Sequence, residues 1–239
     1  MPHLTPAAPS PLTLAVKRAF DIVASVLGLV LLLPLFAIIS IAIKADSPGP
    51  VFFLQERLGR GGRPFRIFKF RSMGVGAAKA GLALTVRADK RVTRVGKFLR
   101  ASKLDELPQL INVLCGSMSL VGPRPEVPEF MKFYSPEQRA IILSMRPGMT
   151  DYATILFRDE NSLLDQNHDP VEVYRQQILP IKFAFYQRYS NEIGILNDLR
   201  IILATILLLA VRRVPKSLGI EHDVKLQPQH RASEANAGA

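Results

Sequence analysis

An apolar run from residue 20 to residue 43 constrains this chain more than any other feature of its sequence. Asp21 is the only charged side chain among these 24 residues. As a straight helix the run would extend about 36 Å, enough to cross roughly 30 Å of hydrocarbon. Pro34 lies near its middle, where a proline removes a backbone hydrogen bond and crowds the preceding turn. The run therefore predicts a membrane helix with a break at Pro34.

The charges beside the run bear on its topology. Lys17 and Arg18 precede it and Lys44 follows it, and basic residues tend to remain on the cytoplasmic side of a membrane. A helix that enters the bilayer, turns at Pro34 and returns to the same face satisfies both basic ends. A spanning helix with a proline kink satisfies the length equally well, so these residues alone leave both topologies open.

The net charge of the protein indicates which kinds of partner it can bind. The 239 residues include 31 Lys and Arg against 20 Asp and Glu, a net charge of +11, and 48% of them are hydrophobic. Such an excess of positive charge indicates nucleic acid, an anionic membrane face or phosphorylated substrates. Because no known DNA- or RNA-binding motif occurs, we expect no nucleic acid partner. A membrane-anchored protein that binds nucleic acid or other anions without catalysis remains the alternative.

The sequence after the apolar run predicts an α/β domain that is mostly helical, with a small β-hairpin. A glycine-rich loop joins the two expected strands, residues 51–54 and 65–73. Apolar periodicity predicts helices at residues 104–114, 135–143, 171–187 and 196–211. The last helix is too short in its apolar part to span a membrane and has a basic end, which favours an interfacial position over a buried one.

These patterns divide the chain into four parts. We expect a disordered lead at 1–13, a membrane helix at 14–46, a main domain at 47–213 and a flexible tail at 214–239. Cys115 is the single cysteine, so a disulfide framework and a cysteine-based metal site are both excluded. The glycine-rich loops typical of nucleotide-binding folds do not occur, and the four histidines are scattered.

Asp105 and Glu106 form the densest chemical feature, a carboxylate pair in a strongly basic stretch. An Asp-Glu pair at a helix start is common because the helix dipole favours negative charge there, so the pair alone does not identify a site. A Gly-Pro-Arg-Pro segment follows at 122–125, and its prolines fix the backbone around Arg124 so that the planar guanidinium can bind a phosphate. A carboxylate that attacks phosphorus needs such cations to offset charge repulsion.

Other cations are weaker candidates for phosphate binding, because each taken alone is more often a solvated surface charge. They are Lys69, Arg71, Arg146 and Arg158. Two aspartates outside these motifs, Asp89 and Asp198, are expected to be inert in any chemistry.

Five blocks of sequence, in this order, resemble the bacterial sugar transferases. These are small monotopic phosphoglycosyl transferases that begin exopolysaccharide, O-antigen or glycoprotein glycan synthesis. The blocks are 17–21 (Lys-Arg-Ala-Phe-Asp), 68–73 (Phe-Lys-Phe-Arg-Ser-Met), 104–114 (Leu-Asp-Glu-Leu-Pro-Gln-Leu-Ile-Asn-Val-Leu), 116–125 (Gly-Ser-Met-Ser-Leu-Val-Gly-Pro-Arg-Pro) and 146–148 (Arg-Pro-Gly).

The resemblance implies a re-entrant membrane helix and interfacial helices that support a catalytic domain on the cytoplasmic face of the bacterial inner membrane. It implies transfer of a sugar 1-phosphate from a UDP-sugar to polyprenyl (undecaprenyl) phosphate, with Asp105 as the nucleophile and a phosphosugar on the enzyme between two steps. It also implies Mg2+ close to Asp105, with Glu106 completing the dyad and Arg124 holding phosphate. Membrane lipids are then partners, and homo-oligomerisation is left open.

Two departures from the family pattern matter. Many relatives have Ser-Pro at the helix break, whereas this chain has Leu33-Pro34. After the Arg-Pro-Gly block many relatives continue Gly-Trp-Ala-Gln, whereas residues 151–154 here are Asp-Tyr-Ala-Thr. The resemblance implies that this second region contacts the donor, so the identity of the sugar cannot be carried over.

Overall fold

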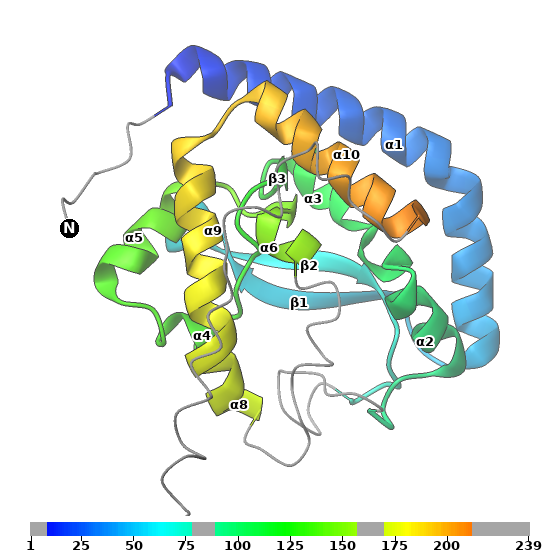
Figure 1. Ribbon diagram of the computed structural model, residues 1–239. Helices are drawn as coiled ribbons and strands as arrows, with labels where there is room; N and C mark the ends of the chain where they lie inside the picture. The colour runs from blue at the N-terminus through cyan, green and yellow to red at the C-terminus, as the bar shows by residue number, and fades with distance from the viewer. Residues whose placement is uncertain (1–8, 78–88, 157–169, 212–239) are drawn as a thin grey trace, which may run out of the picture.

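The computed structural model describes residues 9–77, 89–156 and 170–211 (Figure 1). The long elements are α1 (Pro11–Asp46), β1 (Phe52–Leu58), β2 (Pro64–Phe70), α2 (Arg94–Ala101), α3 (Gln109–Cys115), α5 (Pro136–Ser144), α9 (Leu179–Asn191) and α10 (Ile195–Val211). The short ones are β3 (Ser119–Val121), α4 (Pro128–Met131), β4 (Gly148–Thr150), α6 (Tyr152–Leu156) and α8 (Pro170–Val173). A π-helical turn, Tyr174–Ile178, joins α8 to α9.

The apolar run forms α1, a single 36-residue helix with Pro34 inside it. The helix begins at Pro11, three residues before the predicted start, because the Ser10 hydroxyl caps it and a proline suits the first turn. Its ribbon changes direction part-way along (Figure 1), as expected of a helix that contains a proline. By length and composition α1 could cross a membrane, and apolar side chains such as Leu31, 79% exposed, cover much of its surface.

The N-terminal part of α1 is bound to the domain by buried polar contacts. Lys17 forms an ion pair with Asp198 of α10, and its Nζ donates to Val121 O at 3.0 Å. Asp21 accepts a hydrogen bond from the Ser119 hydroxyl at 2.8 Å. Asp198 is 1% exposed, so it is a buried partner of α1, and its inertness in the chemistry stays a prediction.

The C-terminal part of α1 is bound to the same domain. Arg71, at the end of β2, donates to Ser47 O at 2.7 Å and so closes the last turn of the helix. The Asp46 carboxylate accepts from Val95 N in α2 at 3.0 Å. Phe36 packs edge-on against Phe70 with ring centroids 5.1 Å apart. Both parts of α1 therefore rest on one body, while its middle carries exposed apolar side chains.

The predicted hairpin is confirmed. β1 and β2 pair antiparallel from Phe52↔Phe70 to Leu58↔Pro64, and β1 ends four residues later than expected. A parallel pair, β3 and β4, lies next to it and was not predicted, because each strand has only three residues. The pair requires glycine: a Cβ on Gly148 would lie 2.1 Å from the backbone nitrogen of Gly122.

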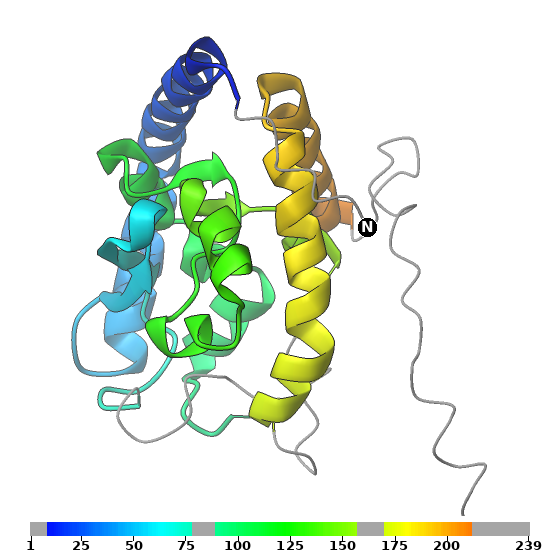
Figure 2. The same ribbon diagram turned by 90° about the vertical axis from the view of Figure 1, so that its left-hand side faces the viewer.

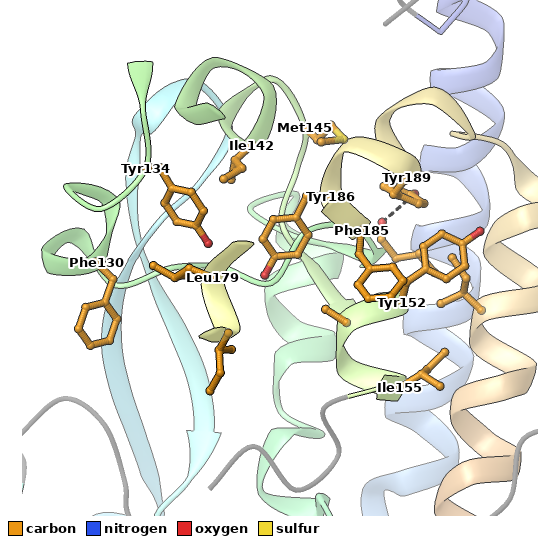
Figure 3. Packing of buried hydrophobic residues seen from close by; sticks show 14 of the residues in the cluster. Phe130, Tyr134, Ile142, Met145, Tyr152, Ile155, Leu179, Phe185, Tyr186 and Tyr189 are labelled. Carbon is orange, nitrogen blue, oxygen red and sulfur yellow. Dashed lines mark hydrogen bonds between the residues drawn. The ribbon is translucent and has the colours of Figure 1, made fainter. Parts of the chain in front are cut away.

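The main core lies between α4, α5, α6, α9, α10 and β3 and is rich in tyrosine (Figure 3). Figure 2 shows α1 and α9 on opposite sides of the elements between them. α10 also contacts α1 and exposes one apolar row, namely Leu196, Leu199, Leu203, Ile206 and Leu209. The described helices at 136–144, 179–191 and 195–211 agree with the predicted ones to within a few residues, apart from the π-helical turn before α9.

Candidate active site

A cavity of about 830 Å3 is lined by the β1–β2 hairpin, the segments after β2 and β3, the Asp105 turn, α6 and α9. Its volume is in the range of sites that bind small molecules. Basic side chains outnumber acidic ones in its lining: Arg57, Lys69, Arg71, Arg91, Arg100, Lys103, Arg124 and Lys182 against Glu56, Asp105, Glu106, Glu129 and Asp151. Such a lining favours an anionic ligand.

The sequence predicts that Asp105 lies at the start of a helix. In the structure it lies on a separate 3-10 turn, Leu104–Glu106, ahead of that helix. The α-helix starts only at Gln109, because Pro108 lacks the amide hydrogen that an earlier turn would use. Lys103, just before the turn, has φ of 59°, and among the described residues it is the only non-glycine residue with positive φ. This conformation costs about 1–2 kcal/mol, and such strain is typical of functional sites.

The Asp105 carboxylate is buried, with 8% of the residue exposed. Its Oδ1 has no hydrogen-bond partner among the described residues. Burial raises the pKa of Asp105, and the negative charge of Glu106 raises it further. Asp105 is thus a buried carboxylate with one oxygen free of protein hydrogen bonds in the described part of the chain.

Glu106 is held by two of the predicted phosphate-binding cations. Arg124 Nη2 lies 2.5 Å and Lys69 Nζ 2.9 Å from Glu106 Oε1, and Arg124 Nη1 lies 3.3 Å from Oε2. Burial opposes ionisation of Glu106, but the charges of Arg124 and Lys69 outweigh it and hold the pKa of Glu106 well below its usual range. The two carboxylates therefore have opposite environments, a pattern that separates acid–base or nucleophilic roles in active sites.

The backbone around Arg124 is fixed from two sides. Asp151, directly after β4, accepts a hydrogen bond from Arg124 N at 3.2 Å, and Arg57 donates to Pro125 O at 3.0 Å. Arg124 and Asp151 both follow the carboxyl ends of parallel strands, the edge where α/β sheets bind ligands. Burial raises the pKa of Asp151, although hydrogen bonds from Thr154 oppose the shift.

Three other predicted phosphate ligands are placed differently. Arg71 lines the cavity, but its guanidinium donates to the carbonyls of Ser47 and Pro48, so its contacts are those of a helix cap. Arg146 is not a lining residue of the cavity; its Nε donates to Gly116 O at 3.1 Å. The backbone of this block, through Gly148, supports the Arg124 segment. Arg158 lies outside the described residues.

With this geometry in view, comparison with known proteins identifies the family. Residues 12–212 match the family described as bacterial sugar transferase. The chain belongs to the bacterial sugar transferase family. The match covers α1, the hairpin, the Asp105 turn and α10, so every element of the candidate site lies within the transferase segment.

Named relatives of this transferase differ in the sugar. The chain is 41% identical over 192 residues to the UDP-glucose:undecaprenyl-phosphate glucose-1-phosphate transferase of Caulobacter vibrioides, covering 80% of this chain and 68% of the relative. An Escherichia coli protein of the same name is 39% identical over 193 residues, 80% of this chain and 39% of the relative. The UDP-N-acetylgalactosamine-undecaprenyl-phosphate N-acetylgalactosaminephosphotransferase of Aeromonas hydrophila is 45% identical over 153 residues, which cover 62% of this chain and 36% of the relative. This chain thus spans little more than a third of the last two relatives.

The transferase site contains two cations that the sequence did not single out. Arg100 and Lys103 line the cavity, and both of their charges act on Asp105. Neither side chain has a protein hydrogen-bond or ion-pair partner among the described residues, whereas the side chains of Lys69 and Arg124 are bound to Glu106. The sequence did show a crowded basic stretch from residue 90 to 103, but spacing alone could not indicate which of its members face the carboxylate.

The residues around Asp105 fit Mg2+ as a substrate-bound ion. Within the described ranges no group of three His, Cys, Asp or Glu side chains could hold a metal by itself. Mg2+ is, however, commonly bound by one or two carboxylates together with substrate phosphates and waters. The unpartnered Oδ1 of Asp105 supplies one such ligand, while both oxygens of Glu106 already accept hydrogen bonds from cations.

Proposed function

We propose that this protein transfers a sugar 1-phosphate from a UDP-sugar to undecaprenyl phosphate. The observation that carries the proposal is the placement of Asp105, a buried carboxylate with a raised pKa on the wall of a cationic cavity. The named relatives from Caulobacter, Escherichia and Aeromonas support the choice of donor and acceptor.

The first step forms a bond between an Asp105 carboxylate oxygen and the sugar-linked phosphorus. The bond from that phosphorus to the bridging oxygen breaks, and uridine monophosphate leaves with the electron pair. Arg100 and Lys103 are the cations available to bind the diphosphate, while Arg124 and Lys69, held by Glu106, fix the charge distribution beside it. Bound Mg2+, held by Asp105 and the phosphates, would neutralise further negative charge.

In the second step an oxygen of undecaprenyl phosphate attacks the same phosphorus. The bond to Asp105 breaks, and the lipid leaves with a diphosphate-linked sugar. Asp105 returns as a carboxylate, so the protein is restored without a further reactant. Glu106, whose pKa is held low, remains ionised throughout and acts as the counter-ion that orients Arg124.

The nucleophile is tested without lipid acceptor. Protein, Mg2+ and donor should release about one equivalent of uridine monophosphate and give a protein heavier by one phosphosugar. Asp105→Asn should abolish the adduct, because an amide of nearly the same shape is a far weaker nucleophile. Asp89→Asn is the matched control, since Asp89 pairs with Arg91 and is not a lining residue. An undiminished adduct in Asp105→Asn would move the nucleophile to another residue.

We further propose that α1 is re-entrant and that the catalytic domain lies on the cytoplasmic face of the inner membrane. The contacts at the two ends of α1 support this topology, because Lys17 near one end and Asp46 at the other both bind the same domain. A helix with its ends on opposite sides of a bilayer could not make both sets of contacts.

Accessibility of single cysteines tests this topology. Ala15 and Ala45 are exposed positions near the two ends of α1, and each is changed to cysteine in a Cys115→Ser background. Both cysteines should resist an impermeant thiol reagent added outside intact cells and react after the cells are opened. Labelling of one cysteine in intact cells would establish a spanning helix instead.

A further inference from the structure

The two ends of the cavity differ in their lining. At the start of β1, next to the C-terminal part of α1, the apolar Pro50, Phe52 and Val75 lie beside Arg71, whose guanidinium caps the helix. At the other end α6 and α9 contribute the polar Thr154, Lys182 and Tyr186. Figure 1 shows α9 across the hairpin from the C-terminal end of α1. A sugar ring, with a polar substituent on nearly every carbon, matches the second end.

Tyr186 of α9 is the unusual residue at this polar end. It lines the cavity and is completely buried. Its hydroxyl has no hydrogen-bond partner among the described residues. Burial and the nearby charges of Asp151 and Glu126 raise the pKa of Tyr186 well above its usual value, so the group is a neutral O–H donor.

The other tyrosines of this chain show how exceptional this is. Each of the remaining four uses its hydroxyl: Tyr134 and Tyr174 donate to Glu126, Tyr152 to Glu192 and Asn197, and Tyr189 to Asp198 and Val121 O. In Figure 3 Tyr186 stands among these buried rings. A buried hydroxyl without a partner opposes folding, and phenylalanine would fill the same space without that penalty. The hydroxyl is therefore better explained by a ligand than by packing.

We infer that the Tyr186 hydroxyl binds a polar substituent of the donor sugar and contributes to the choice of sugar. The inference rests on the proposed function and deepens it. Asp151 is less suited to this role, because each of its oxygens already accepts a backbone hydrogen bond, from Arg124 N and Thr154 N. Asp151, Ala153 and Thr154, from the stretch where this chain departs from its family, line the same cavity as Tyr186, whereas the Tyr152 hydroxyl binds Glu192 and Asn197.

Tyr186→Phe is the test, with Tyr152→Phe as the matched control. Binding of UDP, UDP-glucose and UDP-N-acetylgalactosamine is measured by calorimetry with each protein in an Asp105→Asn background, where no adduct forms, and release of uridine monophosphate is followed in the same proteins with Asp105 intact. Tyr186→Phe should weaken the preferred UDP-sugar roughly three- to tenfold and leave UDP unchanged, because one hydrogen bond to the sugar is lost. Thermal unfolding of Tyr186→Phe should be unchanged or shifted upward, since no protein hydrogen bond is lost.

The control should behave in the opposite way. Tyr152→Phe loses bonds to Glu192 and Asn197 away from the cavity, so its unfolding temperature should fall while its preference for UDP-sugar over UDP stays that of the parent protein. Equal weakening of UDP and UDP-sugar by Tyr186→Phe would assign the hydroxyl to the nucleotide and overturn the inference, as would no change in any affinity. Absence of uridine monophosphate release from the parent protein would instead overturn the proposed transfer. The affinities for UDP-sugar and UDP would still show whether the Tyr186 hydroxyl binds the sugar.

Discussion

Replacing Lys17 with methionine should destabilise the protein strongly. Lys17 is 9% and Asp198 1% exposed, and Lys17 Nζ also donates to Val121 O at 3.0 Å. Methionine keeps the length of the side chain but leaves the Asp198 charge buried, with Tyr189 as its one remaining side-chain donor in the described part of the chain, at 2.8 Å. Breaking one side of a buried ion pair in this way costs about 3–5 kcal/mol. For a chain of this size the unfolding temperature should fall by about 6–20 °C.

The assay is thermal unfolding of detergent-solubilised protein, followed by tyrosine fluorescence. Lys44→Met is the matched control, because it makes the same substitution on the same helix at an exposed position, and it should unfold within about 1 °C of the parent protein. The double variant Lys17→Met, Asp198→Asn should recover part of the loss, since the unpaired charge is gone. A Lys17→Met protein that unfolds with the parent, or single losses that simply add, would refute the reasoning that this buried pair joins α1 to the domain.

Three further predictions concern the site and its support. Arg124→Lys keeps the charge but loses the two-pronged contact with Glu106, and release of uridine monophosphate should fall on the order of a hundredfold; unchanged kcat and donor KM would make this arginine structural. Glu106→Gln removes a charge that raises the pKa of Asp105, so the acid limb of the pH–rate profile for adduct formation should move to lower pH; a limb that stays in place contradicts this electrostatic coupling. Gly148→Ala places a Cβ 2.1 Å from the facing backbone nitrogen, whereas the Cβ of Gly74→Ala meets nothing within 4 Å. Only Gly148→Ala should lower the free energy of unfolding, by about 1–3 kcal/mol, and with it the unfolding temperature.

The sequence predicted most of the longer elements because their signals are local. The 3.6-residue apolar period identified the helices around α5, α9 and α10, and glycines between two alternating segments identified the hairpin. β3 and β4 lie 27 residues apart along the chain and have three residues each, so no local pattern reveals their pairing. The position of Asp105 ahead of α3 depends on the left-handed backbone at Lys103, which sequence does not specify for a lysine.

The sequence predicted that Asp105, Glu106 and Arg124 belong to one site, and they line one cavity, but residue type predicted the contacts of the other cations poorly. Arg71 and Arg146 were placed with the phosphate ligands because arginine often binds phosphate, but both donate to backbone carbonyls. An arginine that caps a helix has the same sequence signature as one that binds a ligand, and only the acceptor in space separates them. Arg100 and Lys103 were missed for the converse reason, since they were two among many basic residues in one stretch.

In the proposed two-step transfer, the charges around Asp105 explain how one site binds two substrates in turn. Six ionised side chains surround the reacting centre: Lys69, Arg100, Lys103, Arg124, Asp105 and Glu106. Cations exceed carboxylates by roughly two charges, close to the two negative charges of a nucleotide diphosphate sugar at neutral pH. Glu106 offsets part of the charge of Lys69 and Arg124, so the unmatched charge is concentrated on Arg100 and Lys103. When uridine monophosphate leaves, that charge is again unmatched, and the phosphate of the lipid acceptor is the anion that can replace it.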